Sequence, residues 1–220
     1  MYRPFDLTGK VALITGGNRG IGFGIAQAVA EAGADVAIWG TNAARNAQAR
    51  AELAMTGRKV VALECDISDE AAVDATFART LELLGRVDGC FANAGIGGDT
   101  VSFIEMSSER WHHVLRVNLD GTFFTFRAAV RHMVERGGDG VLVATASLAA
   151  LEGSPRSEPY AATKGGIISM VRSLAVEFAR HNVRAHAILP GWIETEMTLR
   201  RTTNKTFHGK VMPRIPMRRW

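Results

Sequence analysis

Six short apolar runs punctuate the chain, and a helix-prone segment follows each of the first five. Apolar runs of this length are typical of strands buried on both faces, whereas apolar residues at three- and four-residue spacing indicate helices. The predicted strands are Val11–Thr15, Asp35–Trp39, Val60–Cys65, Val87–Ala92, Gly140–Ala146 and Val183–Leu189. The predicted helices are Ile21–Ala32, Ala43–Met55, Ser68 to about Leu84, Ser107–Glu135, and Pro159 to about Arg180.

Polar residues and one proline mark where the later helices begin. Ser68 precedes two acidic residues and is expected to cap the third helix. Ser107 or Ser108 is expected to cap the fourth. Pro159 suits the first turn of the fifth helix, where a backbone N–H would lack an intrahelical acceptor anyway.

The alternation of strands and helices predicts an α/β fold with a doubly wound parallel sheet, of which six strands can be identified in the sequence. Because ligands of such sheets bind at the carboxyl ends of the strands, the loops after residues 15, 39, 65, 92, 146 and 189 are the candidate binding loops. The sequence contains no internal repeat, low-complexity stretch or linker. Residues 1–220 are therefore expected to form a single domain.

Composition narrows the function classes. A hydrophobic fraction of 47% supports a large core, and 22% charged residues argue against disorder. No apolar run approaches the roughly 18 residues of a membrane span, and the N-terminus lacks the apolar region of a secretory signal. Cys65 and Cys90 fall in apolar runs and are expected to be buried free thiols. These features predict a cytoplasmic protein with no membrane partner.

The net charge of +4 is concentrated near the C-terminus. Seven basic residues and no acidic one lie between Arg200 and Trp220, which leaves a net charge of −3 for residues 1–199. A nucleic-acid-binding protein would need a basic face with a recognisable binding motif, and the sequence has none. We therefore expect no nucleic-acid partner.

A glycine-rich segment joins the first predicted strand to its helix. Glycines there permit a tight turn and a close approach of the backbone to a pyrophosphate, and the helix N-terminus adds N–H donors. An ordinary tight turn is the alternative for a lone glycine cluster, but the position after the first strand favours dinucleotide binding. The segment reads Thr15, Gly16, Gly17, Asn18, Arg19, Gly20, Ile21, Gly22.

This segment resembles the TGxxxGIG element of the short-chain dehydrogenase/reductase family, and further family elements follow in order along nearly the whole chain. They are Asn93-Ala94-Gly95 after the fourth strand, Asn118, Ser147, Tyr160 with Lys164, and Pro190-Gly191 after the sixth strand. The resemblance implies a Rossmann-type sheet and hydride transfer between NAD(P)(H) and a carbonyl or secondary alcohol, closest to the 3-oxoacyl-acyl-carrier-protein reductase branch.

The catalytic residues that the resemblance implies are Asn118, Ser147, Tyr160 and Lys164. Tyr160 and Lys164 are four positions apart on a predicted helix and share a face. A tyrosine has a pKa near about 10, and a neighbouring ammonium lowers it, so that Tyr160 can exchange a proton near neutral pH. Ser147 is expected to orient the substrate oxygen, and Lys164 also to hold the nicotinamide ribose. Asn118 resembles the residue that supports a water-linked proton path to the lysine.

The end of the second strand bears on the choice of cofactor. NAD enzymes place an acid there for the ribose hydroxyls, but this chain has Gly40 and no acid between Asp35 and Glu52. Polar and basic side chains nearby can bind a phosphate, which favours NADP(H), with NAD(H) as the alternative. These are Arg19, Thr41, Asn42 and Arg45. Asp66 and Ile67 resemble the pair that contacts the adenine, although Asp66 also suits a helix cap.

Candidate substrate-pocket segments are mostly small or apolar: Ile96–Asp99, Leu148–Gly153 and Trp192–Met197. Within the last, Ile193 and Thr195 are expected to contact the cofactor, and residues 193–220 resemble a mobile substrate lid. The basic charge of this segment suits an anionic partner such as an acyl carrier protein or coenzyme A. The alternative is that the segment is a solvated basic loop with no charged partner. The expected substrate is a small carbonyl or alcohol compound, most readily an acyl thioester. Sugar and polyol dehydrogenation is the alternative.

The resemblance also implies a homo-oligomer, a tetramer or a dimer, and a seventh strand beyond residue 220. Without that strand the sixth would be an exposed edge, so a protein of these residues alone is expected to be poorly soluble or weakly assembled. No metal site is expected, because the adjacent His112 and His113 point in different directions on a helix. A non-catalytic nucleotide sensor on the same fold is the rival reading, disfavoured by the intact catalytic residues.

Overall fold

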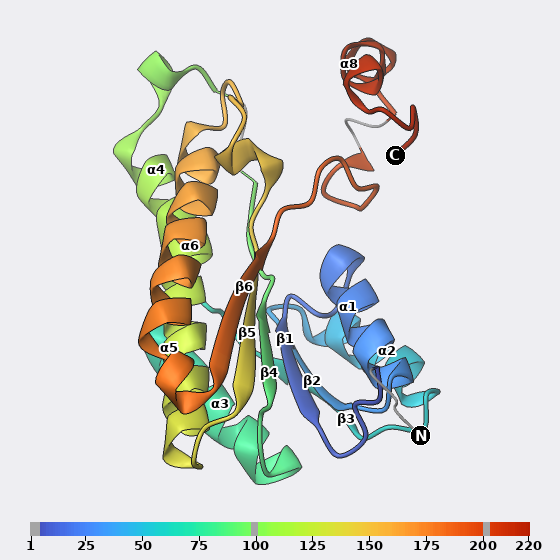
Figure 1. Ribbon diagram of the computed structural model, residues 1–220. Helices are drawn as coiled ribbons and strands as arrows, with labels where there is room; N and C mark the ends of the chain where they lie inside the picture. The colour runs from blue at the N-terminus through green and yellow to red at the C-terminus, as the bar shows by residue number, and fades with distance from the viewer. Residues whose placement is uncertain (1–4, 98–100, 200–202) are drawn as a thin grey trace.

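The computed structural model describes residues 5–97, 101–199 and 203–220. Within these residues, six parallel strands form one sheet in the order β3-β2-β1-β4-β5-β6 (Figure 1). The chain therefore reverses its direction of winding between β1 and β4, as the doubly wound prediction requires. The strands are β1 (Val11–Thr15), β2 (Asp35–Gly40), β3 (Val60–Glu64), β4 (Gly89–Ala92), β5 (Gly140–Thr145) and β6 (Val183–Ile188).

Helices cover both faces of the sheet (Figure 1). On one face lie α1 (Gly20–Glu31) and α2 (Ala43–Ala54), and on the other lie α3 (Glu70–Leu84), α5 (Gly121–Glu135) and α6 (Glu158–Glu177). The remaining helical elements are α4 (Ser108–Leu115), α8 (Lys205–Val211) and the short η1 (Phe103–Glu105), η2 (Arg116–Asp120), η3 (Leu148–Ala150), η4 (Ala179–His181) and η5 (Met212–Arg214).

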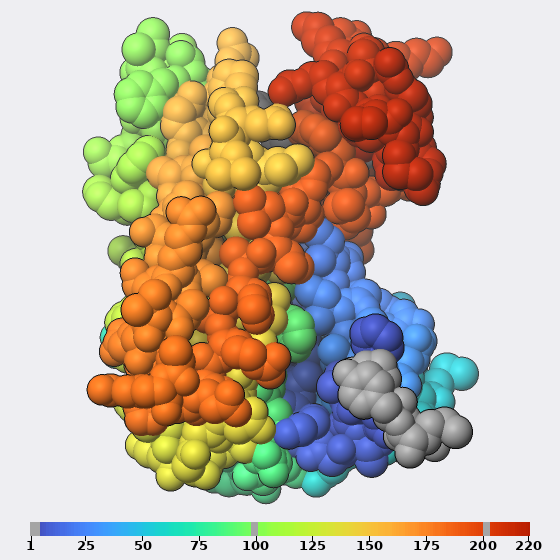
Figure 2. Space-filling view, in the orientation of Figure 1, coloured from blue at the N-terminus to red at the C-terminus, as the bar shows by residue number. Residues whose placement is uncertain are grey.

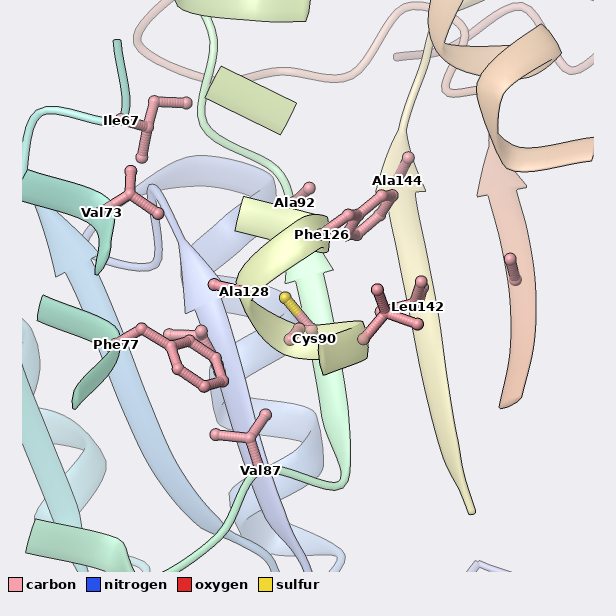
Figure 3. Packing of buried hydrophobic residues seen from close by; sticks show 14 of the residues in the cluster. Ile67, Val73, Phe77, Val87, Cys90, Ala92, Phe126, Ala128, Leu142 and Ala144 are labelled. Atoms are coloured by element: carbon pink, nitrogen blue, oxygen red, sulfur yellow. The ribbon is translucent and has the colours of Figure 1, made fainter. Parts of the chain in front are cut away.

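The strands supply two separate cores because successive side chains point to opposite faces. Leu13 and Trp39 pack on the side of α3, α5 and α6, whereas Ile14 and Ile38 pack against α1 and α2. Figure 3 shows part of the first cluster, in which Phe77 and Phe126 reach from two helices toward the sheet. Burial on both faces explains why the strands are apolar throughout.

Two details of the helices differ from the sequence-based expectations. The cap of α3 is Asp69, whose side chain accepts a hydrogen bond from Ala72 N, because Ser68 instead donates to Asp66 Oδ1. The predicted helix Ser107–Glu135 begins with the expected cap, Ser107, but is not a regular α-helix throughout. A π-helical turn, η2, separates α4 from α5. Such turns widen a helix locally and occur often at functional sites.

The two edges of the described sheet are β3 and β6. Along β6, Val183 and Ala185 are buried, whereas Arg184 and His186 are exposed, so only one face of this strand is covered within the described residues. The position of β6 at an edge of the described sheet agrees with the expectation from the sequence. Among the described residues, no helix is long and apolar enough to span a membrane.

Candidate active site

A cleft of about 310 Å³ opens at the carboxyl ends of the strands, where the winding of the chain reverses between the neighbouring strands β1 and β4. It is lined by all the residues that the sequence assigned to the cofactor and by three of the four assigned to catalysis. The lining includes Gly16, Asn18, Arg19, Gly20, Ile21, Gly22, Thr41, Asn42, Asp66, Ile67, Asn93, Ala94, Gly95, Ser147, Tyr160, Lys164, Pro190, Gly191, Ile193 and Thr195. The fourth, Asn118, is buried behind it.

The glycine loop is fixed to the neighbouring strand ends by Asn93. The Asn93 side-chain amide donates to the carbonyl oxygens of Thr15 and Gly16, at 3.1 and 3.3 Å, and its oxygen accepts from the Thr145 hydroxyl at 3.1 Å. The buried Thr15 hydroxyl in turn accepts from the backbone N–H groups of Asn93 and Ala94, both at 3.1 Å. These hydrogen bonds fix the loop at one wall of the cleft.

The first turn of α1 approaches the loop so closely that only glycine fits. A Cβ atom at Gly22 would lie 2.2 Å from the carbonyl oxygen of Gly16 and 2.4 Å from Asn93 Nδ2. The carbonyl belongs to the backbone and cannot move without distorting the loop. By contrast, a Cβ atom at Gly24, one half-turn along the same helix, would meet nothing within 4 Å.

Gly22→Ala is therefore expected to destabilise the protein by about 1–3 kcal/mol and to weaken dinucleotide binding, because the loop must shift. Gly24→Ala is the matched control, and alanine at that exposed helical position is expected to stabilise by about 0.5–1 kcal/mol. Urea unfolding and calorimetric titration with NADPH measure both effects. Equal stability of the two variants would contradict the close packing of α1 on the loop.

A partly buried amide network occupies the end of β2, where an acid would stand in an NAD enzyme. Asn18 Nδ2 donates to Asn46 Oδ1 at 2.7 Å, and Asn46 Nδ2 donates to the carbonyl oxygens of Gly40 and Leu63. A Cβ atom at Gly40 would lie 2.3 Å from Asn18 Nδ2 and 2.7 Å from Asn46 Oδ1. The network thus fills the space that an acidic side chain at position 40 would need.

Polar groups around this network face the cleft. Asn42 caps α2 by accepting from Arg45 N at 2.9 Å, and the side chain of Arg45 lines the cleft. Arg19, at the N-terminus of α1, lines it from the other side. Both guanidinium groups contact Glu196 from the segment after β6. The cleft therefore carries two arginines near Thr41 and Gly40.

Helix α6 places Tyr160 and Lys164 on the cleft wall, one turn apart. The Lys164 ammonium donates to the carbonyl oxygen of Thr145 at 2.6 Å and lies 5.5 Å from the centroid of the Tyr160 ring. Only 4% of Lys164 is exposed, and this burial lowers its pKa to about 8. The charged form of Lys164 favours the phenolate form of a neighbouring tyrosine.

Ser147 follows β5 and caps η3, because its Oγ accepts from Ala149 N at 3.1 Å. That contact uses a lone pair of the hydroxyl and leaves its hydrogen able to donate to a substrate oxygen. Ser147 and Tyr160 thus reach the cleft from two different elements, the end of a strand and the start of a helix. Such a pair can hold one oxygen atom between two hydroxyl groups.

Asn118 lies in the π-helical turn and binds the loop after β4. Its side-chain oxygen accepts from Ile96 N at 2.8 Å, and its amide donates to Ile96 O at 2.9 Å and to Thr163 Oγ1 at 3.3 Å. A Cβ atom at Gly95 would lie 3.1 Å from Asn118 Oδ1 and 3.7 Å from Lys164 Nζ, so the amide and the amine are near neighbours. The side chain of Asn118 is thereby committed to positioning this loop.

The segment after β6 forms the remaining wall and projects from the sheet with α8 (Figure 1), leaving a notch in the surface between it and the region around α1 (Figure 2). Trp192 packs edge-to-face on Phe207 and Trp220, with ring centroids 5.0 and 5.9 Å away. Arg214 of η5 pairs with Glu152, in the turn after η3, at 3.1 Å. Of the predicted pocket and tail, residues 98–99 and 200–202 lie outside the described residues.

Other candidate residues have ordinary environments. Asp66 lines the cleft, but the alternative that it caps a helix is wrong, because its carboxylate accepts from Ser68 N and Ser68 Oγ and the cap of α3 is Asp69. Cys65 and Cys90 are buried free thiols, as expected, and burial raises the pKa of both. His112 and His113 are exposed on α4. In the described part of the chain, no group of three His, Cys, Asp or Glu side chains could hold a metal ion.

Sequence reasoning missed two residues of the cleft region. Asn46 appeared only as a polar residue in an alanine-rich helix, yet it is buried and holds Asn18. Glu196 lay in a segment identified for its apolar residues, and its arginine partners are distant in sequence. No local pattern signals either contact, because both depend on the packing of separate elements.

Comparisons with known proteins agree with this arrangement. The sequence profile described as short chain dehydrogenase matches residues 10–206. The chain is 39% identical over 193 residues to the 3-oxoacyl-(acyl-carrier-protein) reductase of Chlamydia muridarum, covering 87% of this chain and 77% of that protein. It is 33% identical over 220 residues to the 2-dehydro-3-deoxy-D-gluconate 5-dehydrogenase of Dickeya dadantii, covering 100% and 86%.

A solved structure of a related protein has a closely similar fold. The gluconate 5-dehydrogenase of Burkholderia cenocepacia, determined in complex with NADP and tartrate, superimposes with a TM-score of 0.92 at 32% identity, covering 98% of this chain and 84% of that one. The relatives thus include proteins named for acyl thioesters and proteins named for sugar acids, at comparable identity.

Proposed function

The chain belongs to the short-chain dehydrogenase family, and on that premise we propose that it uses NADPH to reduce the ketone of a 3-oxoacyl thioester. Family membership makes it an oxidoreductase that acts on secondary alcohols or the corresponding ketones with NAD(P). The observation that carries the proposal is that Tyr160, buried Lys164 and Ser147 line the same cleft as the rigid glycine loop.

The residues present fit a dinucleotide. The close approach of Gly22 to Gly16 leaves the loop backbone open toward the cleft, and Asn93 fixes it there. The glycine loop would hold the pyrophosphate, and Lys164 the nicotinamide ribose. When bound, NADPH supplies the hydride that the reduction requires.

The side chains of the site would complete the reaction by handling the proton. Ser147 donates a hydrogen bond to the ketone oxygen and holds it beside Tyr160. The Tyr160 hydroxyl gives its proton to that oxygen, and the Lys164 ammonium stabilises the phenolate that remains. In the reverse direction the phenolate removes the proton from an alcohol. The side chain of Asn118 keeps the loop beside Lys164 in place. Asn118 would also support a water-linked path that carries protons to Lys164.

The preference for NADPH is supported by the end of β2. No acid is available there for the ribose hydroxyls, and the Asn18–Asn46 network fills the space that one would need. Arg19 and Arg45 face the same part of the cleft and can bind a phosphate ester. The NADP complex of the Burkholderia relative supports the same choice.

The preference for an acyl substrate is supported by the walls on the catalytic side. Ile96, Ile193 and Met197 line the cleft, and Leu148 and Leu151 are exposed beside its mouth. Apolar walls suit an acyl chain better than a polyhydroxylated sugar, which requires hydrogen-bonding partners. The basic residues of α8 and the following turn would face an anionic carrier. Sugar-acid dehydrogenation is the second candidate, favoured by the gluconate relatives.

A substrate panel tests the proposal. Acetoacetyl-coenzyme A, 5-ketogluconate and simple cyclic ketones are offered with NADPH and, in parallel, with NADH, and absorbance at the nicotinamide band is followed. We expect the thioester with NADPH to give the highest kcat/KM, by at least about tenfold, which is the discrimination that one well-placed pocket supplies. Faster turnover of the sugar acid would select the second candidate. Faster turnover with NADH would overturn the cofactor preference.

A further inference from the structure

Glu196 joins two walls of the cleft. Its carboxylate oxygen Oε2 lies 3.0 Å from Arg19 Nη1 and 3.3 Å from Arg45 Nη1. Arg19 belongs to the glycine loop before α1, Arg45 to the first turn of α2, and Glu196 to the segment after β6. All three side chains line the cleft. Two guanidinium groups from separate elements thus converge on one acidic oxygen.

This convergence suits a phosphate ester as well as a carboxylate. Guanidinium groups bind both by charge-assisted hydrogen bonds, and a phosphate carries the larger negative charge and more acceptor oxygens. The arginines flank the end of β2, where the Asn18–Asn46 network excludes an acid at position 40. Their only anionic partner in the described part of the cleft is Glu196.

We propose that Glu196 stands in for the 2′-phosphate of NADP in the cofactor-free protein and thereby sets how strongly the site distinguishes NADP from NAD. A 2′-phosphate competes with the Glu196 carboxylate for Arg19 and Arg45. NAD has no such group, so the ion pairs can persist beside it. Glu196 therefore reduces the preference for NADP. This inference rests on the cofactor preference proposed above and names a residue that tunes it.

The ion pairs of Glu196 with the two arginines are suited to replacement by a phosphate group of a ligand. About half of each side chain is exposed, 53% for Arg19, 46% for Arg45 and 56% for Glu196, and ion pairs in such surroundings are weak and readily replaced. A buried pair would resist replacement by a ligand.

Exchange at Glu196 would also affect the catalytic end of the cleft. The Thr198 hydroxyl accepts from Thr195 N at 2.9 Å and donates to Ile193 O at 2.7 Å, which makes Ile193–Thr198 one compact turn. Thr195 of this turn lies beside Gly20 of the glycine loop, 3.4 Å from the position a Cβ atom would take there. Release of Glu196 thus frees the turn that carries Ile193 and Thr195 over the cofactor cleft.

Two nucleotide fragments isolate the contribution of the 2′-phosphate. 2′,5′-ADP and 5′-AMP share the adenosine 5′-phosphate and differ only in the 2′-phosphate, and calorimetric titration gives their dissociation constants without any turnover. Glu196→Gln keeps the shape of the side chain and removes its charge. Glu194→Gln, in the same segment but outside the cleft lining, is the matched control.

We expect Glu196→Gln to tighten 2′,5′-ADP binding about threefold to tenfold, the range that removal of a competing exposed ion pair allows, and to leave 5′-AMP within about twofold. Glu194→Gln should leave both affinities unchanged, and about 1 M salt should shrink the effect because it screens exposed charges. Arg45→Ala should weaken 2′,5′-ADP binding selectively in both backgrounds.

The outcomes separate this inference from the cofactor preference. If the wild-type protein prefers 2′,5′-ADP and Glu196→Gln does not increase that preference, the inference is wrong while the cofactor preference stands. If the wild-type protein shows no preference but Glu196→Gln acquires one, the inference stands and the NADPH preference falls. An equal loss of affinity for both fragments would make Glu196 a structural anchor and overturn the inference.

Discussion

Tyr160→Phe is expected to lower kcat for ketone reduction by about 10²–10⁴-fold, the usual contribution of a general acid. Phenylalanine preserves the ring that lies beside the Lys164 ammonium but has no proton to give to the substrate oxygen. The affinity for NADPH and the thermal unfolding midpoint should remain close to those of the wild-type protein. Stopped-flow absorbance with saturating NADPH and the best substrate of the panel measures the loss.

The control is Ser147→Ala, which removes the other hydroxyl group that contacts the substrate's ketone oxygen. If Ser147 orients the substrate and Tyr160 supplies the proton, the double variant should lose less than the product of the two single losses, because the two groups act on one atom. Retention of more than a tenth of the wild-type kcat by Tyr160→Phe would remove the tyrosine from its proposed role.

Lys164→Met is expected to abolish turnover and, in the cofactor-free protein at pH 7, to increase stability. Burial lowers the pKa of Lys164 from 10.5 to about 8, so keeping Lys164 charged destabilises the folded protein. By linkage this destabilisation is on the order of 3 kcal/mol, present in full below about pH 8. Methionine fills the same space without charge.

The pH dependence has a definite sign. Between about pH 8 and 10.5 the unfolded chain still binds the lysine proton while the folded protein has released it, so wild-type stability rises with pH relative to the variant. Urea unfolding at pH 7, 8, 9 and 10 should therefore show the advantage of Lys164→Met shrinking. Lys210→Met, at an exposed lysine of α8, should show no such trend. A constant difference across this range would refute the lowered pKa.

The strands were predictable because each is buried on both faces and so has a strong apolar signal. The boundaries of β1 agree with the prediction, and those of the other strands lie within two residues of it. Most residues that line the cleft were predictable because they belong to short motifs of the family that the sequence resembles. That they share one cleft follows from the parallel sheet, which brings all the carboxyl ends of its strands to one edge.

What the sequence did not reveal depends on contacts between distant elements or on a local competition. Ser68 and Asp69 are both good caps, and the choice falls to Asp69 only because Asp66 binds Ser68. The π-helical turn at Asn118 is invisible in a helix-prone sequence. Glu196 reaches Arg19 across 177 positions, and no spacing rule predicts such a contact.

In the proposed reaction, a hydride passes from NADPH to a ketone carbon in this cleft, and Tyr160 is the proton donor. The most direct test supplies NADPH deuterated at C4 of the nicotinamide, in each of its two stereoisomers, with the best substrate of the panel, and locates the label by mass spectrometry. We predict deuterium on the carbinol carbon of the product from one stereoisomer alone, and almost none from Tyr160→Phe in the same time. NADPH oxidation that leaves the alcohol product unlabelled with both stereoisomers would exclude direct hydride transfer to the ketone, and equal labelling by Tyr160→Phe would exclude Tyr160 as the proton donor.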